Sequence, residues 1–279
     1  MNVLNRSRAN ETRDSIQARV HIYRTRQERR CAMIHFHGTP ITPETAAATA
    51  LCGGHAFISF ADARNLSIAL DVCQSFATDN GAFGAWTRGN PIKDWTQYYE
   101  WIAELHRYPS FDFAVIPDVI DGDEDSNDAL LAEWPWRKSA PHVGAPVWHL
   151  HESIERLQRL ASEWPRICIG SSGQFAKLKT PAWWNRMAET FNAICDKAGR
   201  PICKVHGLRM LDPDVFSRFP FASADSTNIA RNIGIDSAWK GTYQPPTKEA
   251  RAAVMRSRIE SVNSPTFWRE VPEQIAIGF

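Results

Sequence analysis

The chain has 279 residues, of which 23% are charged and 43% belong to the AVILMFWYC set, as in an ordinary globular protein. This composition excludes a disordered tail, a collagen-like fibre and a small domain held by disulfides. The formal net charge is +1, but residues 1–30 carry eight arginines against three acidic residues, so that segment is +5 and residues 31–279 are −4. We expect residues 1–30 to form a basic arm, which either neutralises phosphates or is a solubilising terminus, and residues 31–279 to form one folded domain.

The six cysteines form no Cys-x-x-Cys pair, and most lie in apolar runs such as Arg-Ile-Cys-Ile. This pattern predicts buried free thiols in a reducing compartment rather than a zinc site. The chain also has no apolar run of 18 residues and no apolar signal segment. We therefore expect a cytoplasmic protein without a membrane partner.

Short apolar or β-branched runs alternate with longer amphipathic runs along the chain. They predict eight strands, at about residues 32–36, 55–60, 74–78, 111–117, 146–150, 166–170, 202–206 and 221–225. Strands that alternate with helices pair in parallel through right-handed crossovers, and eight such units are the count of a (β/α)₈ barrel. The alternative is a doubly wound open sheet, but residues 36–40 (Phe-His-Gly-Thr-Pro) lack the G-x-G-x-x-G fingerprint that often follows its first strand. The sequence therefore favours a single-domain α/β fold, the TIM barrel.

Helices are expected between these strands. In the clearest one, Thr180 caps the start, Pro181 fits the first helical position and Gly199 marks the end. Further helices are expected from Glu152, from about Asp94, and over residues 43–51 and 62–73.

In a barrel of this kind, the active site lies at the carboxyl ends of the strands. Three aspartates follow or end predicted strands: Asp79, Asp118 and Asp225. An aspartate after a strand often caps the next helix, and Asp225 before Ser-Thr-Asn is the most cap-like of the three. Alternatively, two such carboxylates divide the work of nucleophile and proton carrier at a sugar C1′, while the third accepts hydrogen bonds from a guanine-like base.

Other residues at these strand ends have two interpretations each. Residues 170–173 (Gly-Ser-Ser-Gly) form either a plain turn or a loop whose backbone N–H groups meet a carbonyl or a phosphate. Phe83 is either part of the core or a flat surface on which a base stacks. His206 either covers the other face of that base or is a buried histidine with its hydrogen bonds satisfied.

A metal site is an alternative use of the histidines. Imidazole and carboxylate ligands suit zinc, and the arrangement resembles amidohydrolase barrels; the candidates are His35, His37, His149, His151, His206 and Asp225. Against this alternative, the sixth predicted strand ends in Gly-Ser-Ser-Gly rather than in a histidine. A metal-dependent hydrolase would also leave Asp79 and Asp118 without a role.

Five segments resemble those of the tRNA-guanine (queuine) transglycosylases, in the same order and at similar spacing across about residues 32–232. They are residues 78–83 (Thr-Asp-Asn-Gly-Ala-Phe), 117–119 (Pro-Asp-Val), 169–173 (Ile-Gly-Ser-Ser-Gly), 205–208 (Val-His-Gly-Leu) and 223–226 (Ser-Ala-Asp-Ser). The resemblance implies a glycosyltransferase that exchanges guanine for a free 7-deazaguanine base. For this chain we expect no cofactor and no metal.

The resemblance also implies a role for each matching residue. Asp225 would attack C1′ of a guanosine nucleotide and form a covalent glycosyl-enzyme, and Asp79 would take the proton of the incoming base. The remaining residues would bind the base: Asp118 at its N1/N2 edge, Gly170 and Ser171 at its O6 side, and Phe83 and His206, with Gly207 next to it, on its faces. His149 stands where the family usually has a base-contacting glutamine.

Two departures from the tRNA enzymes favour DNA as the polynucleotide. No cysteine follows Cys203, so the zinc site of those enzymes is missing, and the chain is short. Both features resemble the small phage and prophage branch, which acts on DNA and needs its target nucleotide flipped out or single-stranded. A tRNA substrate and an inactive nucleic-acid-binding barrel are the alternatives. The cations expected to meet phosphates are Arg24, Arg26, Arg88, Lys93, Lys177, Lys179 and Arg231.

Overall fold

The computed structural model describes residues 33–239 and 241–269. The chain divides into two units, Met1–Met33 and Ile34–Phe279, and the described strands and helices belong to the second. The predicted basic arm, with Arg24 and Arg26, lies outside the described residues.

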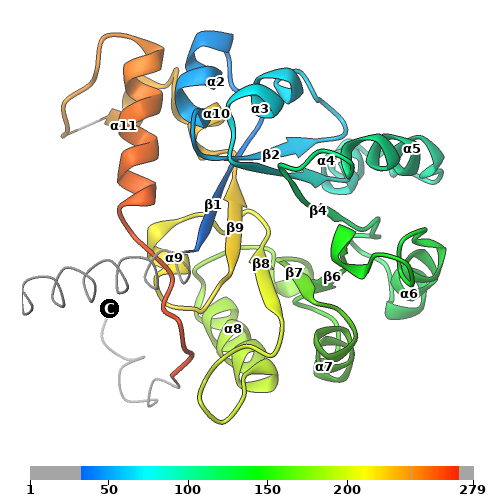
Figure 1. Cartoon of the computed structure of the whole chain (residues 1–279). Coiled ribbons are helices and arrows are strands. Elements are labelled where there is room, and N and C mark those ends of the chain that lie inside the picture. The colour runs from blue at the N-terminus through cyan, green and yellow to red at the C-terminus, as the bar shows by residue number, and fades with distance from the viewer. Residues whose placement is uncertain (1–32, 240, 270–279) are drawn as a thin grey trace, which may run out of the picture. The chain divides into compact units, whose positions relative to one another are not determined.

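Parallel strands form the centre of the fold (Figure 1). In chain order they are β1 (Ile34–Gly38), β2 (His55–Ser59), β3 (Ser75–Asp79), β4 (Phe111–Val115), β5 (Gly144–Ala145), β6 (Val147–His149), β7 (Arg166–Gly170), β8 (Lys204–Gly207) and β9 (Ser223–Ser226). Hydrogen bonds join neighbouring strands in the order β5-β4-β3-β2-β1-β9-β8-β7-β6, and each of these pairings is parallel.

The sheet closes on itself at Pro146. This residue alone separates β5 from β6, and it has no N–H group with which to continue a ladder. β5 pairs with β4, and β6 pairs with β7, so the two pieces together form the fifth strand of a barrel. The Pro146 carbonyl accepts a hydrogen bond from the Cys168 N–H at 2.8 Å, which continues the contact with β7. The (β/α)₈ barrel predicted from eight apolar runs is therefore confirmed, and the open doubly wound sheet is wrong.

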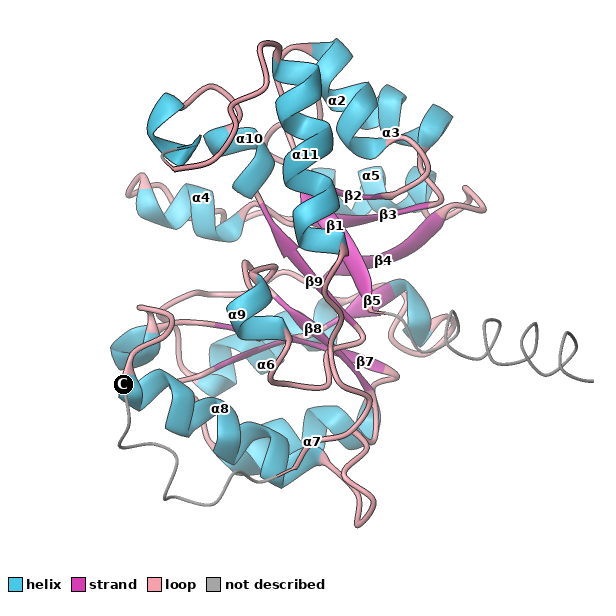
Figure 2. Cartoon of the chain, turned by 90° about the vertical axis from the view of Figure 1, so that its left-hand side faces the viewer, coloured by secondary structure: helices cyan, strands magenta, loops and turns pink. Residues whose placement is uncertain are grey.

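Helices surround the strands in both views (Figures 1 and 2). They are α2 (Glu44–Leu51), α3 (Leu66–Val72), α4 (Ala82–Thr87), α5 (Thr96–Leu105), α6 (Glu124–Glu133), α7 (Ile154–Glu163), α8 (Pro181–Ile194), α9 (Pro213–Phe216), α10 (Asn228–Asn232) and α11 (Lys248–Glu260). Every helix expected from the sequence is present, with shifted ends.

Local sequence signals explain where these helices begin. The Thr180 hydroxyl accepts a hydrogen bond from the Trp183 N–H, and a proline opens α8, as predicted. In α7 the cap is Ser153 rather than Glu152, and its hydroxyl accepts from the Arg156 N–H. α8 ends at Ile194, before the predicted stop at Gly199, because Cys195 is already extended.

Among the described residues, two groups of buried side chains pack against the first strands and inside the barrel. The inside of the barrel holds Phe36, Phe57, Ala77, Phe113, Val115, Ala145, Val147 and Cys168. A second group lies outside the first strands, beneath α2, α3, α10 and α11, and includes Ile41, Leu51, Ile58, Phe76 and Ile229. At the amino end of the strands, Arg166 pairs with both oxygens of Asp112 at 2.9 Å and lies 4.1 Å from the Phe113 ring. This pair closes that end, which leaves the carboxyl end for chemistry.

The cysteines are less buried than predicted. The five that the structure describes are free thiols, as expected, but only Cys168 is buried. Cys52 is exposed because it follows the last residue of α2, where the chain turns outward. Apolar neighbours in the sequence do not guarantee burial at the end of a helix.

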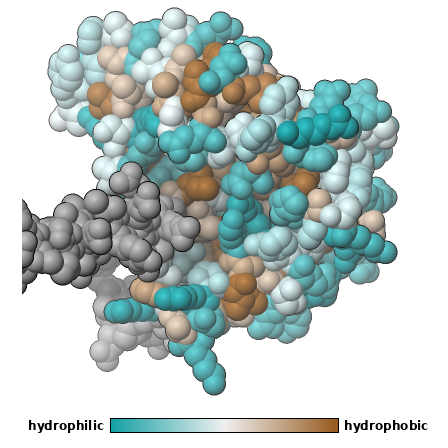
Figure 3. Space-filling view, in the orientation of Figure 1, coloured by the Kyte–Doolittle hydropathy of each residue, from teal (hydrophilic) through white to brown (hydrophobic). Residues whose placement is uncertain are grey.

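On the face seen in Figure 3, hydrophobic residues form separate spots between hydrophilic ones. In the described part of the chain, none of the helices combines the length and the apolar character needed to span a bilayer.

Candidate active site

The three predicted aspartates lie together at the carboxyl end of the barrel. Asp79 ends β3, Asp118 follows β4 and Asp225 is the third residue of β9. The negative charges of Asp225 and Asp118 both raise the pKa of Asp79, and the side chain of the next residue, Asn80, donates to Asp118. Asp118 and Asp225 do not cap helices: the α6 cap is Asp123, and α10 begins without a side-chain cap.

The surroundings of the Asp79 carboxyl raise its pKa. Its Oδ2 accepts hydrogen bonds from the Gly81 N–H at 3.2 Å and from the Ser59 hydroxyl at 3.5 Å. Desolvation, followed by the charges of Asp225 and Asp118, raises the pKa of Asp79 to about 7. Near neutral pH this carboxyl therefore exists in both its protonated and its ionised form, as a proton carrier must.

Asp225 is buried, and the described residues hold it through one of its two oxygens. Its Oδ1 accepts the Arg209 N–H at 2.9 Å and lies 3.3 Å from His206 Nε2. Burial lowers the pKa of His206 despite the opposing charge of Asp225, so the ring is neutral at neutral pH, and its Nδ1 lies 2.8 Å from the Ser223 hydroxyl. None of the described residues hydrogen-bonds Asp225 Oδ2. That oxygen is therefore available as a nucleophile.

Asp118 is held by two neighbours that fix both of its oxygens. Asn80 Nδ2 donates to Oδ1 at 2.7 Å, and His149 Nε2 lies 2.9 Å from Oδ2. On the other side of the His149 ring, Nδ1 lies 3.4 Å from Glu152 Oε1. Burial lowers the pKa of His149, but the hydrogen bonds with Asp118 and Glu152 outweigh this effect and raise it to about 9. A protonated His149 donates to both carboxylates and keeps Asp118 in the acceptor role.

The partners of Glu152 extend this network away from the site. Arg156 Nη1 donates to Glu152 Oε2 at 2.6 Å, and Asn127 Nδ2 donates to Oε1 at 3.0 Å. Glu152 and Arg156 are both buried, and their opposite charges compensate each other, with His149 and Asp128 as further partners. Sequence reasoning missed this network, although the spacing of the two residues, four apart at a helix start, is a readable signal.

The glycine-rich turn after β7 is fixed in place. Gly170 is the last residue of the strand. The hydroxyl of Ser171 accepts a hydrogen bond from Trp183 Nε1 at 2.9 Å, and that of Ser172 lies 2.6 Å from His151 Nδ1. Both serines are buried, so the residues that follow β7 are part of the packed structure and not an exposed turn.

An arginine that sequence reasoning missed completes the site. The half-buried Phe83 lies on α4, and the guanidinium carbon of Arg209 stands 3.7 Å from the centre of its ring. Arg209 Nη2 donates to the Ser171 carbonyl at 3.4 Å. The guanidinium also interacts electrostatically with the three carboxylates, Asp225, Asp79 and Asp118. No motif pointed to Arg209, because the residue follows the matched segment 205–208.

His206 does not take the position that the resemblance implies. Its ring is fully buried inside the barrel and stacks on Phe57, with 5.2 Å between the ring centres. It therefore presents no face to a base, and the expected sandwich with Phe83 is not formed. The physical reason is strand alternation, which turns His206 into the barrel. The neighbouring Gly207 is tightly packed, since a Cβ there would lie 2.9 Å from the Met210 Cβ.

The histidines of the alternative metal site do not converge. Because Phe36 points into the barrel, its neighbours on β1 face outward: His35 Nε2 lies 2.9 Å from the Val262 carbonyl, and His37 Nε2 lies 3.0 Å from Glu260 Oε1. Among the described residues, no group of three His, Cys, Asp or Glu side chains is arranged to hold a metal ion. The ligand set of the metal-dependent hydrolase is therefore not assembled.

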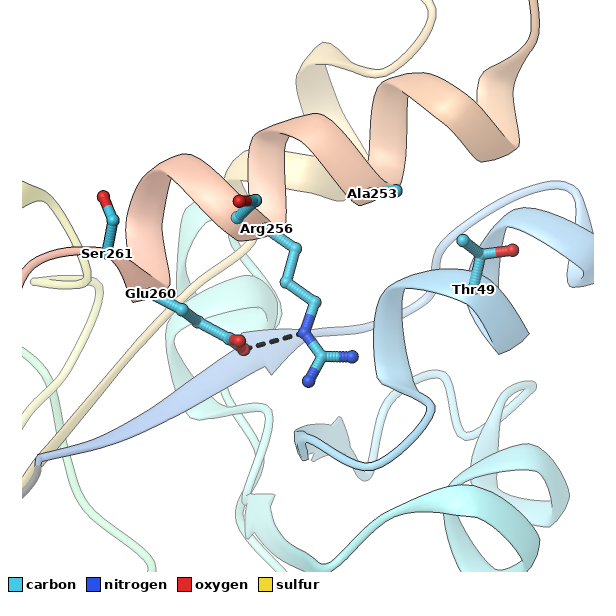
Figure 4. Close-up of a pocket in the computed structure, with 6 residues that line it drawn as sticks. Thr49, Ala253, Arg256, Glu260 and Ser261 are labelled. Atoms are coloured by element: carbon cyan, nitrogen blue, oxygen red, sulfur yellow. Dashed lines mark hydrogen bonds and ion pairs between the residues drawn. The ribbon is translucent and has the colours of Figure 1, made fainter. Parts of the chain in front are cut away.

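A hollow of ≈ 480 Å³ lies beside α2 and α11, and Figure 4 shows residues that line it. Its lining is Thr49, Ala253, Arg256, Ser257, Glu260 and Ser261. Arg256 Nε donates to Glu260 Oε1 at 2.9 Å, and Arg256 Nη1 donates to the Cys52 carbonyl at 2.6 Å. The charged groups of this hollow are thus paired with each other. The hollow is a seam between helices, apart from the carboxylates at the strand ends.

The predicted phosphate-binding cations differ in availability. Lys179 is already ion-paired with Asp212 at 2.6 Å and Asp214 at 3.0 Å, so it offers less positive charge to a phosphate than predicted. The remaining described candidates are exposed: Arg88, Lys93, Lys177 and Arg231.

No protein-family model matches the chain, and no curated protein matches it. Among solved structures, a mutant tryptophan synthase α-subunit from the hyperthermophile Pyrococcus furiosus is similar, with 9% sequence identity and a TM-score of 0.46 over 82% of this chain and 96% of that chain. The α/β barrel itself is a fold on which many enzymes are built.

Proposed function

We propose that the protein is a transglycosylase that exchanges guanine in DNA for a 7-deazaguanine base through a covalent aspartyl-glycosyl intermediate. The observation that carries this proposal is the meeting of Asp79, Asp118 and Asp225 at the carboxyl end of the barrel, where burial and the neighbouring charges raise the pKa of Asp79 to about 7. A proton carrier, a carboxylate with a free oxygen and a base acceptor are the three groups that the exchange requires. The order of the matching segments along the chain supports the same function.

In the first half of the reaction, Asp225 Oδ2 attacks C1′ of the target deoxyguanosine. The C1′–N9 bond breaks, its electron pair stays on guanine, and protonated Asp79 delivers a proton to the departing base. The sugar is then joined to Asp225 through an ester bond. The contacts of His206 and Arg209 with Oδ1 leave the attacking oxygen unobstructed.

In the second half, the incoming 7-deazaguanine gives its N9 proton to ionised Asp79. Its N9 then attacks C1′, and the C1′–Asp225 bond breaks with its electron pair returning to the carboxylate. Two displacements on one carbon retain its configuration. A pKa of about 7 suits both halves, because Asp79 must give a proton in one and accept a proton in the other.

Asp118 selects the base that binds. Its oxygens are oriented by Asn80 and by protonated His149, and each keeps acceptor capacity for a further donor. Guanine and 7-deazaguanines present two adjacent donors, N1–H and the N2 amino group, whereas adenine presents no such pair. A carboxylate in this position therefore selects the guanine class.

The substrate assignment is tested with DNA and with tRNA that carry labelled guanine, each incubated with 7-cyano-7-deazaguanine. The wild type and a control variant at an exposed position of α3, Asp71→Asn, are expected to release label from DNA, and Asp225→Asn is expected to release none. Release of label from tRNA but not from DNA would show that the substrate is RNA. Release from neither polymer would refute the proposed activity.

A further inference from the structure

The Phe83 ring and the Arg209 guanidinium lie face to face at the site. The separation of 3.7 Å between the ring centre and the guanidinium carbon is direct contact, with no space for a ligand between them. Only one hydrogen bond of the described structure holds the guanidinium, and that bond to the Ser171 carbonyl is long, at 3.4 Å. Arg209 is also exposed, so its long side chain is free to withdraw.

We propose that Arg209 is the second stacking partner of the bound base, which enters between the Phe83 ring and the Arg209 guanidinium. This inference rests on the proposed function and adds to it the residue that replaces buried His206. Each stacked base occupies about 3.4 Å, the rise per base in DNA. The guanidinium must therefore move away from the Phe83 ring by about that distance, which a long side chain supplies by rotation of its own bonds.

The charges of the site favour this arrangement. Asp79, Asp118 and Asp225 all act on Arg209, so the guanidinium is drawn toward the carboxylates that surround the base. Guanine leaves C1′ with the electron pair of the glycosidic bond, and a cation above its ring stabilises that charge. A planar guanidinium both stacks on a base and attracts it electrostatically, whereas an ammonium group attracts the base but has no plane with which to stack.

The backbone of Arg209 also contacts the nucleophile, Asp225. Its φ of 58° lies in the left-handed region, which is uncommon for a residue with a side chain. In this conformation the Arg209 N–H donates to Asp225 Oδ1 while the side chain reaches Phe83. One residue thus positions the attacking carboxylate and covers the base.

The test measures the dissociation constant of 7-cyano-7-deazaguanine by titration calorimetry. Arg209→Gly removes the whole side chain but keeps the backbone N–H and accepts the left-handed φ. Arg209→Asn, which also tolerates this φ, takes its place if the glycine variant does not fold. The control is Arg218→Ala, because Arg218 stacks on Trp184 at 4.7 Å outside the site. We expect dissociation constants about tenfold higher for Arg209→Gly, as for the loss of one stacking contact, and unchanged for the control.

The outcomes separate this inference from the proposed function. Tighter binding by Arg209→Gly would show that the guanidinium competes with the base, and unchanged binding would show that the base stacks elsewhere; either result overturns the inference alone. Arg209→Lys is expected to bind more weakly than the wild type, and binding equal to the wild type would overturn the stacking role. Wild-type protein that binds no 7-deazaguanine would overturn the proposed function, and this inference with it.

Discussion

Replacing Asp79 with asparagine is expected to stabilise the folded protein at pH 8 and to leave its stability unchanged at pH 4. The pKa of Asp79 is about 7 in the folded state, against an ordinary value of 3.8. Between these values the folded protein holds a proton that the unfolded chain has lost. The contribution of Asp79 to the free energy of unfolding is therefore largest below pH 3.8 and is lost as the pH rises through about 7.

The size of the effect depends on the pKa difference. A difference of about 3 pH units, at 1.36 kcal/mol for each, corresponds to a penalty of about 4 kcal/mol at pH 8. Asparagine does not titrate and escapes this penalty. For a domain of this size, the gain corresponds to a rise in Tm of about 10 °C.

The assay is thermal unfolding followed by circular dichroism at pH 4, 6 and 8. Asp79→Asn should gain Tm over the wild type progressively as the pH rises. The control is Asp71→Asn, at an exposed position on α3, which should follow the wild type at every pH. Equal Tm values for Asp79→Asn and wild type at pH 8 would refute the argument that burial and the neighbouring carboxylates raise the pKa of Asp79.

Three further predictions concern the surroundings of the site. Glu152→Gln removes one of the two carboxylates beside His149, so the pKa of His149, about 9 in the wild type, should fall; NMR titration of the ring measures it, and an unchanged value would contradict the network. Gly207→Ala places a Cβ against Met210 and should lower the free energy of unfolding by about 1–3 kcal/mol in urea denaturation; no loss would show that the packing gives way. Arg231→Ala should weaken DNA binding and make its salt dependence shallower, and an unaltered slope would remove this residue from the phosphate contacts.

The barrel was predictable because its signals are local. Each strand is a short apolar run, and the crossover rule orders such runs into a parallel sheet. The carboxyl ends of the strands then bring Asp79, Asp118 and Asp225 together, whatever their distance along the chain. The split of the fifth strand at Pro146 also has a local cause, the missing N–H, but its position inside the run required the structure.

The errors have a common physical origin in side-chain direction. Because side chains alternate along a strand, His206 faces into the barrel, whereas His35 and His37 face outward. The sequence signal for the outward direction is Phe36, an apolar residue between the two histidines. Arg209 was missed for a different reason. Its reach across the site depends on a left-handed φ of 58°, and no residue pattern indicates that conformation at an arginine.

The most direct test of the central claim is the mass of the protein after incubation with a guanine-containing oligonucleotide, measured by intact-protein mass spectrometry under denaturing conditions. The proposed chemistry predicts a covalent adduct of the oligonucleotide, with peptide mapping placing the bond on Asp225 and with no adduct on Asp225→Asn. An Asp225→Asn protein that is folded and still exchanges labelled guanine would contradict the claim that this carboxylate carries the reaction.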